Sequence, residues 1–108
     1  MKLQINSGKI PLSGTVENLI RKNLGEDVEK HLQKFKNIDP TANVHVIKRS
    51  RFGFKVLYDL PLPGKRIFSE EKNEDLHKAI RKLKYEVIRQ IKRHKDRLNR
   101  LQTKSSKQ

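Results

Sequence analysis

Hydrophobic positions in the first third of the chain change from a period of two to a period of three to four. Apolar and polar residues alternate over residues 2–6, which predicts a short first strand. A helix is then expected from the N-cap Ser13 to about Phe35, because a serine at this position accepts a bond from a free backbone N–H. Gly25 costs this helix about 1 kcal/mol relative to alanine and predicts a local irregularity. The apolar side of the helix contains Val16, Leu19, Ile20, Leu24, Val28, Leu32 and Phe35.

The middle of the chain is rich in β-branched and aromatic residues and predicts three further strands. Residues 44–49 and 52–60 are expected to pair as a hairpin through the connection at residues 49–51. A turn follows at residues 61–64, Pro-Leu-Pro-Gly, because proline fixes φ and glycine accepts positive φ. Residues 65–69 then form the fourth strand. Alternation along the second run predicts a common side for Phe52, Phe54, Val56, Tyr58 and Leu60.

Residues 76–101 predict one long helix. Its apolar residues recur at spacings of three, four and seven, as on a buried helical face. The acids of residues 70–75 precede this helix, where carboxylates oppose the macrodipole by about 0.3–1 kcal/mol, and Asn73 is a candidate cap. A metal or general-base site is disfavoured there, because no convergent set of ligands accompanies these acids. The apolar stripe consists of Leu76, Ile80, Leu83, Val87, Ile91, Leu98 and Leu101.

The elements follow one another in the order β-α-β-β-β-α. This order predicts an α+β fold in which a four-stranded sheet carries two helices packed on one face. With 108 residues, the chain is long enough for one domain with a modest core. We expect this domain to span residues 1–101. Residues 102–108 contain no apolar side chain and are expected to form a disordered basic tail.

Positive charge is concentrated on the second helix, opposite its apolar stripe. Residues 75–108 carry twelve lysines and arginines against three acids, which supplies +9 of the formal net charge of +14. A solvated helix usually places glutamates four residues before its lysines, so this excess favours a polyanionic partner over a merely solvated face. The cations on the outer arc are Lys78, Lys82, Arg89, Lys92, Arg93 and Arg100, while Lys84 and Lys95 lie nearer the apolar stripe.

The remaining candidate residues have structural explanations. Lys48, Arg49 and Arg51 lie at the hairpin turn, where charge protects a sheet edge, although this turn could also contact a phosphate of bound RNA. His94 lies on the apolar stripe, which predicts a hydrogen-bonded packing role. The spacing of the histidines is not that of metal ligands. Aromatic residues make up 6% of the chain and no exposed pair is evident, which favours recognition of structured RNA through its shape and backbone.

Several classes of function are disfavoured by what the sequence lacks. We find no glycine-rich phosphate loop, no Ser-His-Asp context and no nucleophile elbow, so no catalytic residue, metal or cofactor is assigned and an enzyme is not expected. There is no cysteine. No apolar run approaches the ~20 residues of a membrane span, and no signal segment opens the chain. A cytoplasmic protein without membrane association is therefore expected.

Three segments resemble the ribosome hibernation-promoting factor family, which is also described as ribosome-associated inhibitor or protein Y. Residues 1–6, Met-Lys-Leu-Gln-Ile-Asn, are similar to the family's first strand, and residues 73–80 resemble its Asp-Met-Tyr-x-Ala-Ile helix start. Residues 89–98, Arg-Gln-Ile-Lys-Arg-His-Lys-Asp-Arg-Leu, resemble the family's Arg-Gln-Leu-x-Lys-His-Lys-x-Lys-Leu and form the most specific match. The resemblance covers residues 1–101 and implies the same β-α-β-β-β-α fold.

The resemblance implies binding to ribosomal RNA of the small ribosomal subunit, in the channel of messenger and transfer RNA. Translation would be blocked by steric exclusion and idle ribosomes would be preserved. The match to the family motif implies that Arg89, Arg93 and Lys95 contact the RNA. The other cations of the outer arc are candidates because they lie on the helical face opposite the apolar stripe. Residues 22–29 differ from the family's Lys-Leu-x-Lys-Leu-Glu pattern, and His77 replaces its usual tyrosine. The first helix therefore contributes only two weaker candidates, Arg21 and Lys22.

The resemblance is to the short form of the family, without the dimerisation domain of the long form. Such relatives imply a monomer when free, and a separate ribosome modulation factor as the partner that pairs ribosomes. Two alternative functions remain open. One is a stand-alone module for structured RNA, and the other is a regulator that binds an acidic protein partner.

Overall fold

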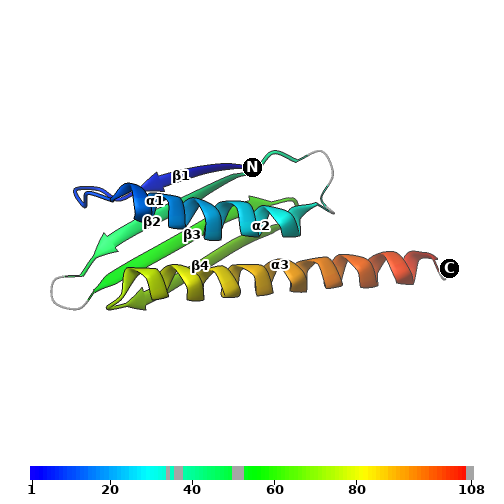
Figure 1. Ribbon diagram of the computed structural model, residues 1–108. Helices are drawn as coiled ribbons and strands as arrows, with labels where there is room; N and C mark the ends of the chain where they lie inside the picture. The colour runs from blue at the N-terminus through cyan, green and yellow to red at the C-terminus, as the bar shows by residue number, and fades with distance from the viewer. Residues whose placement is uncertain (34, 36–37, 50–52, 107–108) are drawn as a thin grey trace.

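A single mixed sheet forms the back of the molecule. The computed structural model describes residues 1–33, 35, 38–49 and 53–106. The strand order is β1-β2-β3-β4, in which β1 runs parallel to β2 and the other neighbours are antiparallel (Figure 1). This arrangement confirms the predicted β-α-β-β-β-α order. The strands are β1 (Lys2–Asn6), β2 (Thr41–Lys48), β3 (Phe54–Leu62) and β4 (Lys65–Asn73).

The first helical segment changes its winding along its length. Ser13 caps it as predicted, because its Oγ accepts a bond from the backbone N–H of Val16 at 3.2 Å. The expected irregularity at Gly25 takes the form of a π-helical stretch, and the segment ends at Leu32, before the predicted Phe35. Its consecutive parts are α1 (Gly14–Ile20), the π-helical stretch (Arg21–Glu26), α2 (Asp27–Glu29) and a 3₁₀ turn (Lys30–Leu32).

The π-helical stretch lies against the sheet through two contacts. The buried Tyr58 of β3 donates a hydrogen bond from its hydroxyl to the backbone oxygen of Leu24 at 3.0 Å. Gly25 is buried, and a methyl group added to it would lie 3.5 Å from Leu3 Cδ2. The irregular turn is therefore a packed part of the fold.

The long helix α3 (Leu76–Ser106) begins as predicted but extends past Leu101. Its N-cap is Asp75, whose Oδ1 accepts bonds from the backbone N–H groups of His77 and Lys78 at 2.9 and 3.4 Å. Asn73, the predicted cap, instead accepts a bond from the backbone N–H of Asp75 at 2.9 Å. The separation of a domain from a disordered tail at residue 102 stays a prediction.

The predicted role of the acidic run before α3 is wrong for Glu70 and Glu71. These residues belong to β4, where they pair with Leu57 and Val56 of β3, so backbone ladder bonds replace the expected interaction with the helix macrodipole. Glu70 forms ion pairs with two lysines, at 3.6 and 3.7 Å. The fourth strand is consequently longer than predicted, and the third ends two residues later than predicted, in the first half of the expected turn. The reversal itself is limited to Pro63 and Gly64, and φ of Gly64 is +79°.

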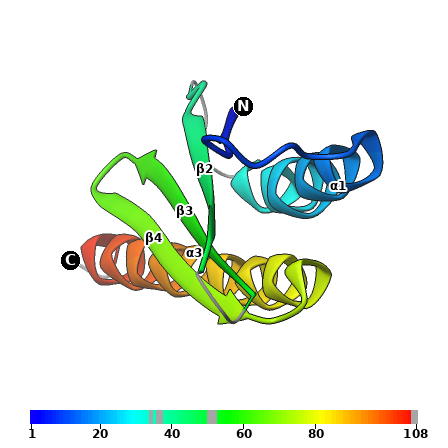
Figure 2. The same ribbon diagram turned by 90° about the vertical axis from the view of Figure 1, so that its left-hand side faces the viewer.

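The core lies between the sheet and the two helical segments, which run side by side over one face of the sheet (Figures 1 and 2). Alternate residues of β2, β3 and β4 point into it, which confirms the predicted side for Val56, Tyr58 and Leu60. Phe52, the first residue predicted for this strand, lies outside the described residues. The largest fully buried side chains are Tyr58, Ile20, Leu24, Leu60, Ile67, Ile80, Leu83 and Ile91.

The α3 helix is longer than the sheet that supports it. Its 31 residues span about 46 Å at 1.5 Å per residue, whereas a nine-residue strand spans about 30 Å. The C-terminal turns therefore extend beyond the sheet (Figure 1). Leu98 follows the spacing of the apolar stripe but is 36% exposed, because no strand lies beneath it. The sheet thus fixes the first two thirds of the helix and leaves the end projecting.

Candidate nucleic-acid interface

The α3 helix carries most of the predicted RNA-binding residues. Its buried residues occupy the side facing the sheet, so the cations between them point away from the core. Lys95 is half-buried and has an interaction partner. The other predicted cations of α3 are exposed, namely Lys78, Lys82, Arg89, Lys92, Arg93 and Arg100.

These cations divide between two sides of the helix. Lys82 and Arg89 border a shallow hollow that the helix forms with edge strand β4. Arg93 borders a second recess, nearer the Pro63-Gly64 turn. Among the described side chains, none forms an ion pair with Lys82 or Arg93, whereas Arg89 Nε lies 3.5 Å from a carboxylate oxygen of Glu86. We call the surface of Lys82, Arg89 and Arg93 the β4 side.

The recess at the end of the β4 side brings together cations from distant parts of the sequence. Lys65 at the start of β4 lies opposite Arg93 and Arg97 of α3, around a volume of about 360 Å³. The buried His94 lines its wall and is held by Pro63, whose backbone oxygen lies 3.2 Å from His94 Nε2. The recess therefore concentrates positive charge on a fixed aromatic surface.

The other side of α3 faces the first helical segment. Here Lys92 and Lys95 lie close enough to His31 for their positive charges to act on its imidazole. Burial of the ring and the charges of these two lysines lower the pKa of His31. The imidazole is therefore neutral at neutral pH, and the positive charge on this side comes from the ammonium groups.

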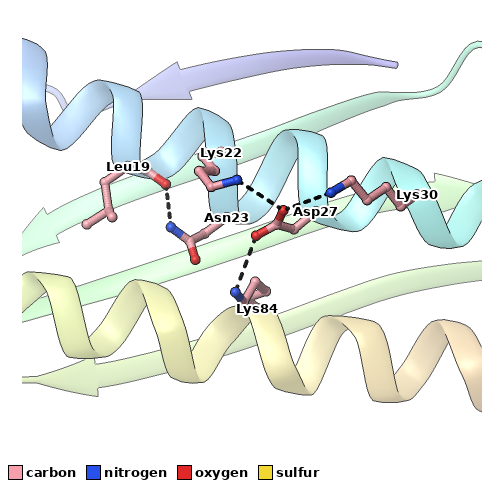
Figure 3. A network of polar contacts seen from close by, with 6 residues as sticks. All are labelled: Leu19, Lys22, Asn23, Asp27, Lys30 and Lys84. Atoms are coloured by element: carbon pink, nitrogen blue, oxygen red, sulfur yellow. Dashed lines mark hydrogen bonds and ion pairs between the residues drawn. The ribbon is translucent and has the colours of Figure 1, made fainter.

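Asp27 contacts three lysines, two on its own helical segment and Lys84 on α3, which joins the two segments (Figure 3). Its carboxylate lies 3.3 Å from the Lys84 ammonium, 3.7 Å from that of Lys22 and 3.8 Å from that of Lys30. Burial opposes ionisation of Asp27, but the hydrogen bond from Lys84 and the three positive charges outweigh it, so the pKa of Asp27 is lowered. Lys84 also lies over the ring of Tyr85, with its nitrogen 5.2 Å from the ring centroid.

The two predicted candidates of the first helical segment are exposed and already engaged in ion pairs. Arg21 contacts Glu17, one turn earlier, with a nitrogen–oxygen distance of 3.1 Å. Lys22 shares Asp27 with the other two lysines. Compared with the β4 side, this segment therefore presents positive charge that carboxylates partly neutralise.

Tyr85 is one of the residues of this surface that the sequence analysis did not select. It is 67% exposed and lies among the cations of α3, three residues after Lys82 and four before Arg89. The sequence did contain an indication of this, because Tyr85 is an aromatic residue that falls outside the three-and-four spacing of the apolar stripe. Arg81 and Arg97 were also omitted, although both are exposed cations of the same helix. Lys65 carried no such signal, since it comes close to Arg93 through the packing of α3 against β4.

Other predicted features have different outcomes. The packing role of His94 is confirmed, because its ring is buried and stacks on Phe35 with 5.7 Å between ring centroids. Lys48 and Arg49 are exposed at the hairpin turn, and Arg51 lies outside the described residues. Within the described part of the chain, no three histidine or acidic side chains form a group that could hold a metal ion.

A family model described as Sigma 54 modulation protein / S30EA ribosomal protein matches residues 3–99. The chain belongs to this family. The match includes β1 from Leu3 onward, the other three strands in full, and all of the predicted cationic positions except Arg100. It confirms the family indicated by the three sequence segments.

A curated relative of the chain is the ribosome hibernation promotion factor of Staphylococcus aureus (strain COL). It is 26% identical over 102 residues, which cover 93% of this chain and 51% of the relative. The chain thus spans about half the length of this curated relative.

Two solved structures share the S30EA fold seen here. The Thermus thermophilus Protein Y N-terminal domain matches with a TM-score of 0.70 at 17% identity, covering 87% of this chain and 99% of that domain. A ribosomal subunit interface protein from Coxiella burnetii matches with a TM-score of 0.64 at 19% identity, covering 89% of this chain and 99% of that one. Across the described residues of this S30EA chain, no helix has both the length and the apolar character needed to span a membrane.

Proposed function

We propose that this chain is a ribosome hibernation factor that binds the small ribosomal subunit and occupies the channel of tRNA and mRNA. Translation is then blocked by steric exclusion, and idle ribosomes are preserved in the cytoplasm. The observation that carries the proposal is the row of exposed cations along α3, a helix whose first two thirds the sheet supports, in a chain of the S30EA family. The names of the relatives, a hibernation promotion factor and a ribosomal subunit interface protein, support the same function.

The proposed mechanism depends on backbone contacts with folded RNA. Phosphate contacts supply affinity and fix the orientation of the protein, and each released counterion makes binding weaker at higher salt. Lys82, Arg89 and Arg93 are the cations for which the geometry argues most strongly, because they lie together on the β4 side. Lys78, Lys92, Lys95 and Arg100 extend the contact along α3, and Arg21 and Lys22 are secondary contacts.

The proposal is tested with a variant that removes the positive charge of the β4 side. Lys82→Gln, Arg89→Gln and Arg93→Gln are combined, and binding to purified small subunits is measured by co-sedimentation across a salt series. We expect weaker binding, and a slope of log affinity against log salt that is smaller by about 0.7–0.9 for each lost phosphate contact.

A matched variant distinguishes the effect on binding of losing contacts on the β4 side from the effect of lowering the total positive charge. Lys2→Gln, Lys9→Gln and Arg66→Gln also remove three charges from exposed positions, but none of the three lines either recess beside α3. This variant should bind almost as the parent chain does. Equal binding of all three proteins would count against the proposal, as would equal affinity of the parent chain for an isolated RNA duplex. A second readout is competition, since bound mRNA and tRNA should reduce the association of the chain with small subunits.

A further inference from the structure

The shallow hollow between α3 and edge strand β4 combines three kinds of chemistry. It has a volume of about 560 Å³ and is open to solvent. Tyr85 forms an aromatic wall, the cations Lys82 and Arg89 stand one turn before and one turn after it, and β4 supplies carboxylate. The residues that line the hollow are Ser69, Glu70, Glu71, Lys82, Tyr85, Glu86 and Arg89.

The aromatic wall is exposed and held in place. Tyr85 is 67% exposed, although the other tyrosine of the chain is fully buried. The ammonium of Lys84 lies 5.2 Å from the ring centroid of Tyr85 and is itself anchored to Asp27 at 3.3 Å. This cation–π contact restrains the ring without covering it, which reduces the entropy lost when a flat ligand stacks on it.

The charged residues on either side of Tyr85 indicate which kind of planar ligand the hollow would bind. A nucleobase can stack on an exposed aromatic ring while the neighbouring phosphates contact cations on either side. Lys82 and Arg89 are suitably placed for those phosphates, because each borders the hollow next to Tyr85. Of the three carboxylates that line the hollow, those of Glu70 and Glu86 already form ion pairs, Glu86 with Arg89. The carboxylate of Glu71 forms none with the described side chains, can only accept hydrogen bonds when ionised, and therefore suits a base that presents an exocyclic amino group.

We propose that the hollow beside Tyr85 binds one unstacked nucleotide of a single-stranded RNA segment, with the base on the Tyr85 ring and its phosphates against Lys82 and Arg89. Bases with an exocyclic amino group, such as cytosine, bind better there than uracil. The inference rests on the proposed function in taking RNA as the partner. It adds a base-stacking contact to a surface otherwise expected to recognise shape and phosphates.

The first test compares Tyr85→Leu with Tyr85→Phe. Leucine keeps apolar bulk, helix propensity and charge but removes the ring, whereas phenylalanine keeps the ring. Binding of short, fluorescently labelled oligocytidine is measured by anisotropy. The Leu variant should bind roughly 5- to 100-fold more weakly, the range for loss of one stacked base, with an unchanged salt slope, and the Phe variant should match the parent chain. Equal affinities of the Leu and Phe variants would overturn the inference.

The second test asks whether the hollow prefers a base with an exocyclic amino group. Oligocytidine should bind more tightly than oligouridine, and Glu71→Gln should reduce this preference, because the amide also presents a hydrogen-bond donor. The same affinity for both oligonucleotides, in the parent chain and in the Glu71 variant, would refute base selection. A Tyr85→Leu effect of the same size on duplex RNA would also overturn the inference, since a duplex offers no unstacked base.

Binding of the chain to small subunits distinguishes a failure of this inference from a failure of the proposed function. Co-sedimentation of the parent chain together with equal oligonucleotide binding by the Leu and Phe variants would leave the function intact and reject the stacking site. Absence of co-sedimentation would reject the function, and the oligonucleotide comparison would still decide whether Tyr85 stacks on a base.

Discussion

Asp27→Asn tests how strongly one carboxylate holds the two helical segments together. The substitution keeps nearly the same shape but removes the negative charge that lies within 4 Å of three ammonium groups. The side chains of Asp27 and Lys84 are only 21% and 17% exposed, while those of Lys22 and Lys30 are 64% and 69% exposed. The loss should therefore be dominated by the contact with Lys84.

The size of the effect follows from these exposures. A hydrogen bond to a charged group contributes about 1.5–3 kcal/mol to the free energy of unfolding, and this value applies to the Lys84 contact. Exposed ion pairs such as those with Lys22 and Lys30 contribute about 0–1 kcal/mol each. We expect Asp27→Asn to lower the free energy of unfolding by about 1.5–5 kcal/mol at pH 7, of which the Lys84 contact is the largest part.

The pH dependence has a defined sign. Because the pKa of Asp27 is lowered in the folded chain, its contribution is complete above the pKa of the unfolded state, about 3.9, and is lost as the pH falls through the folded value. Urea unfolding followed by circular dichroism should thus separate the parent chain from the variant at pH 7 and bring them together in strong acid. A double-mutant cycle with Lys84→Met should give a coupling of about 0.5–3 kcal/mol. A coupling near zero, or a stability difference that persists unchanged in strong acid, would refute this reasoning.

The same substitution should strengthen binding to polyanions, because Lys22, Lys30 and Lys84 lose their shared carboxylate. Asp59→Asn is the matched control, since it makes the same charge change at an ion pair with Arg66 on the uncovered face of the sheet. We expect tighter binding to small subunits and a steeper salt dependence for Asp27→Asn only. If both variants bind more tightly by the same factor, the tighter binding comes from the total charge and not from the helical surface, and the prediction is wrong.

Three further substitutions test the fold. Tyr58→Phe should lower the free energy of unfolding by about 1–3 kcal/mol in urea titrations, because it deprives the buried backbone oxygen of Leu24 of its hydroxyl donor. Gly25→Ala should raise the melting temperature through a gain of about 0.4–1 kcal/mol, since its new methyl group would meet Leu3 at an ordinary contact distance of 3.5 Å. Gly53→Ala should be strongly destabilising in the same thermal scan, because φ is +71° and the methyl group would lie 2.2 Å from backbone atoms at the end of β4.

Periodicity predicted most of this fold because burial follows it directly. The alternation ending at Leu60 and the three-and-four spacing from Leu76 to Ile91 both correspond to side chains in the core. The errors occurred where a residue's local preference competes with tertiary pairing. Glu70 and Glu71 suit a helix N-terminus, yet ladder bonds to β3 extend the strand through them. Such an outcome depends on the partner strand and is absent from the local sequence.

The candidate site was less predictable than the fold. A helical wheel identifies exposed cations, but it does not show which of them a carboxylate neutralises. Asp27 and Lys84 are 57 residues apart, and Lys65 comes close to Arg93 through the packing of α3 against β4, so neither association has a local signal. Tyr85 did have one, because an aromatic residue on the polar side of a helix departs from the pattern of its neighbours.

The projecting end of α3 has a different local stability from the rest of the helix. Arg97, Leu98 and Arg100 are exposed, and an isolated helical stretch shorter than about 12–15 residues is marginal in water. Amide protons of this end should therefore exchange with solvent through fraying, at a far lower free energy than those beside Ile80 or Leu83. A polyanion that neutralises its arginines would suppress this fraying and would slow exchange there first. Deuterium uptake by the backbone amides at the end of the helix should therefore show whether a polyanionic partner is bound.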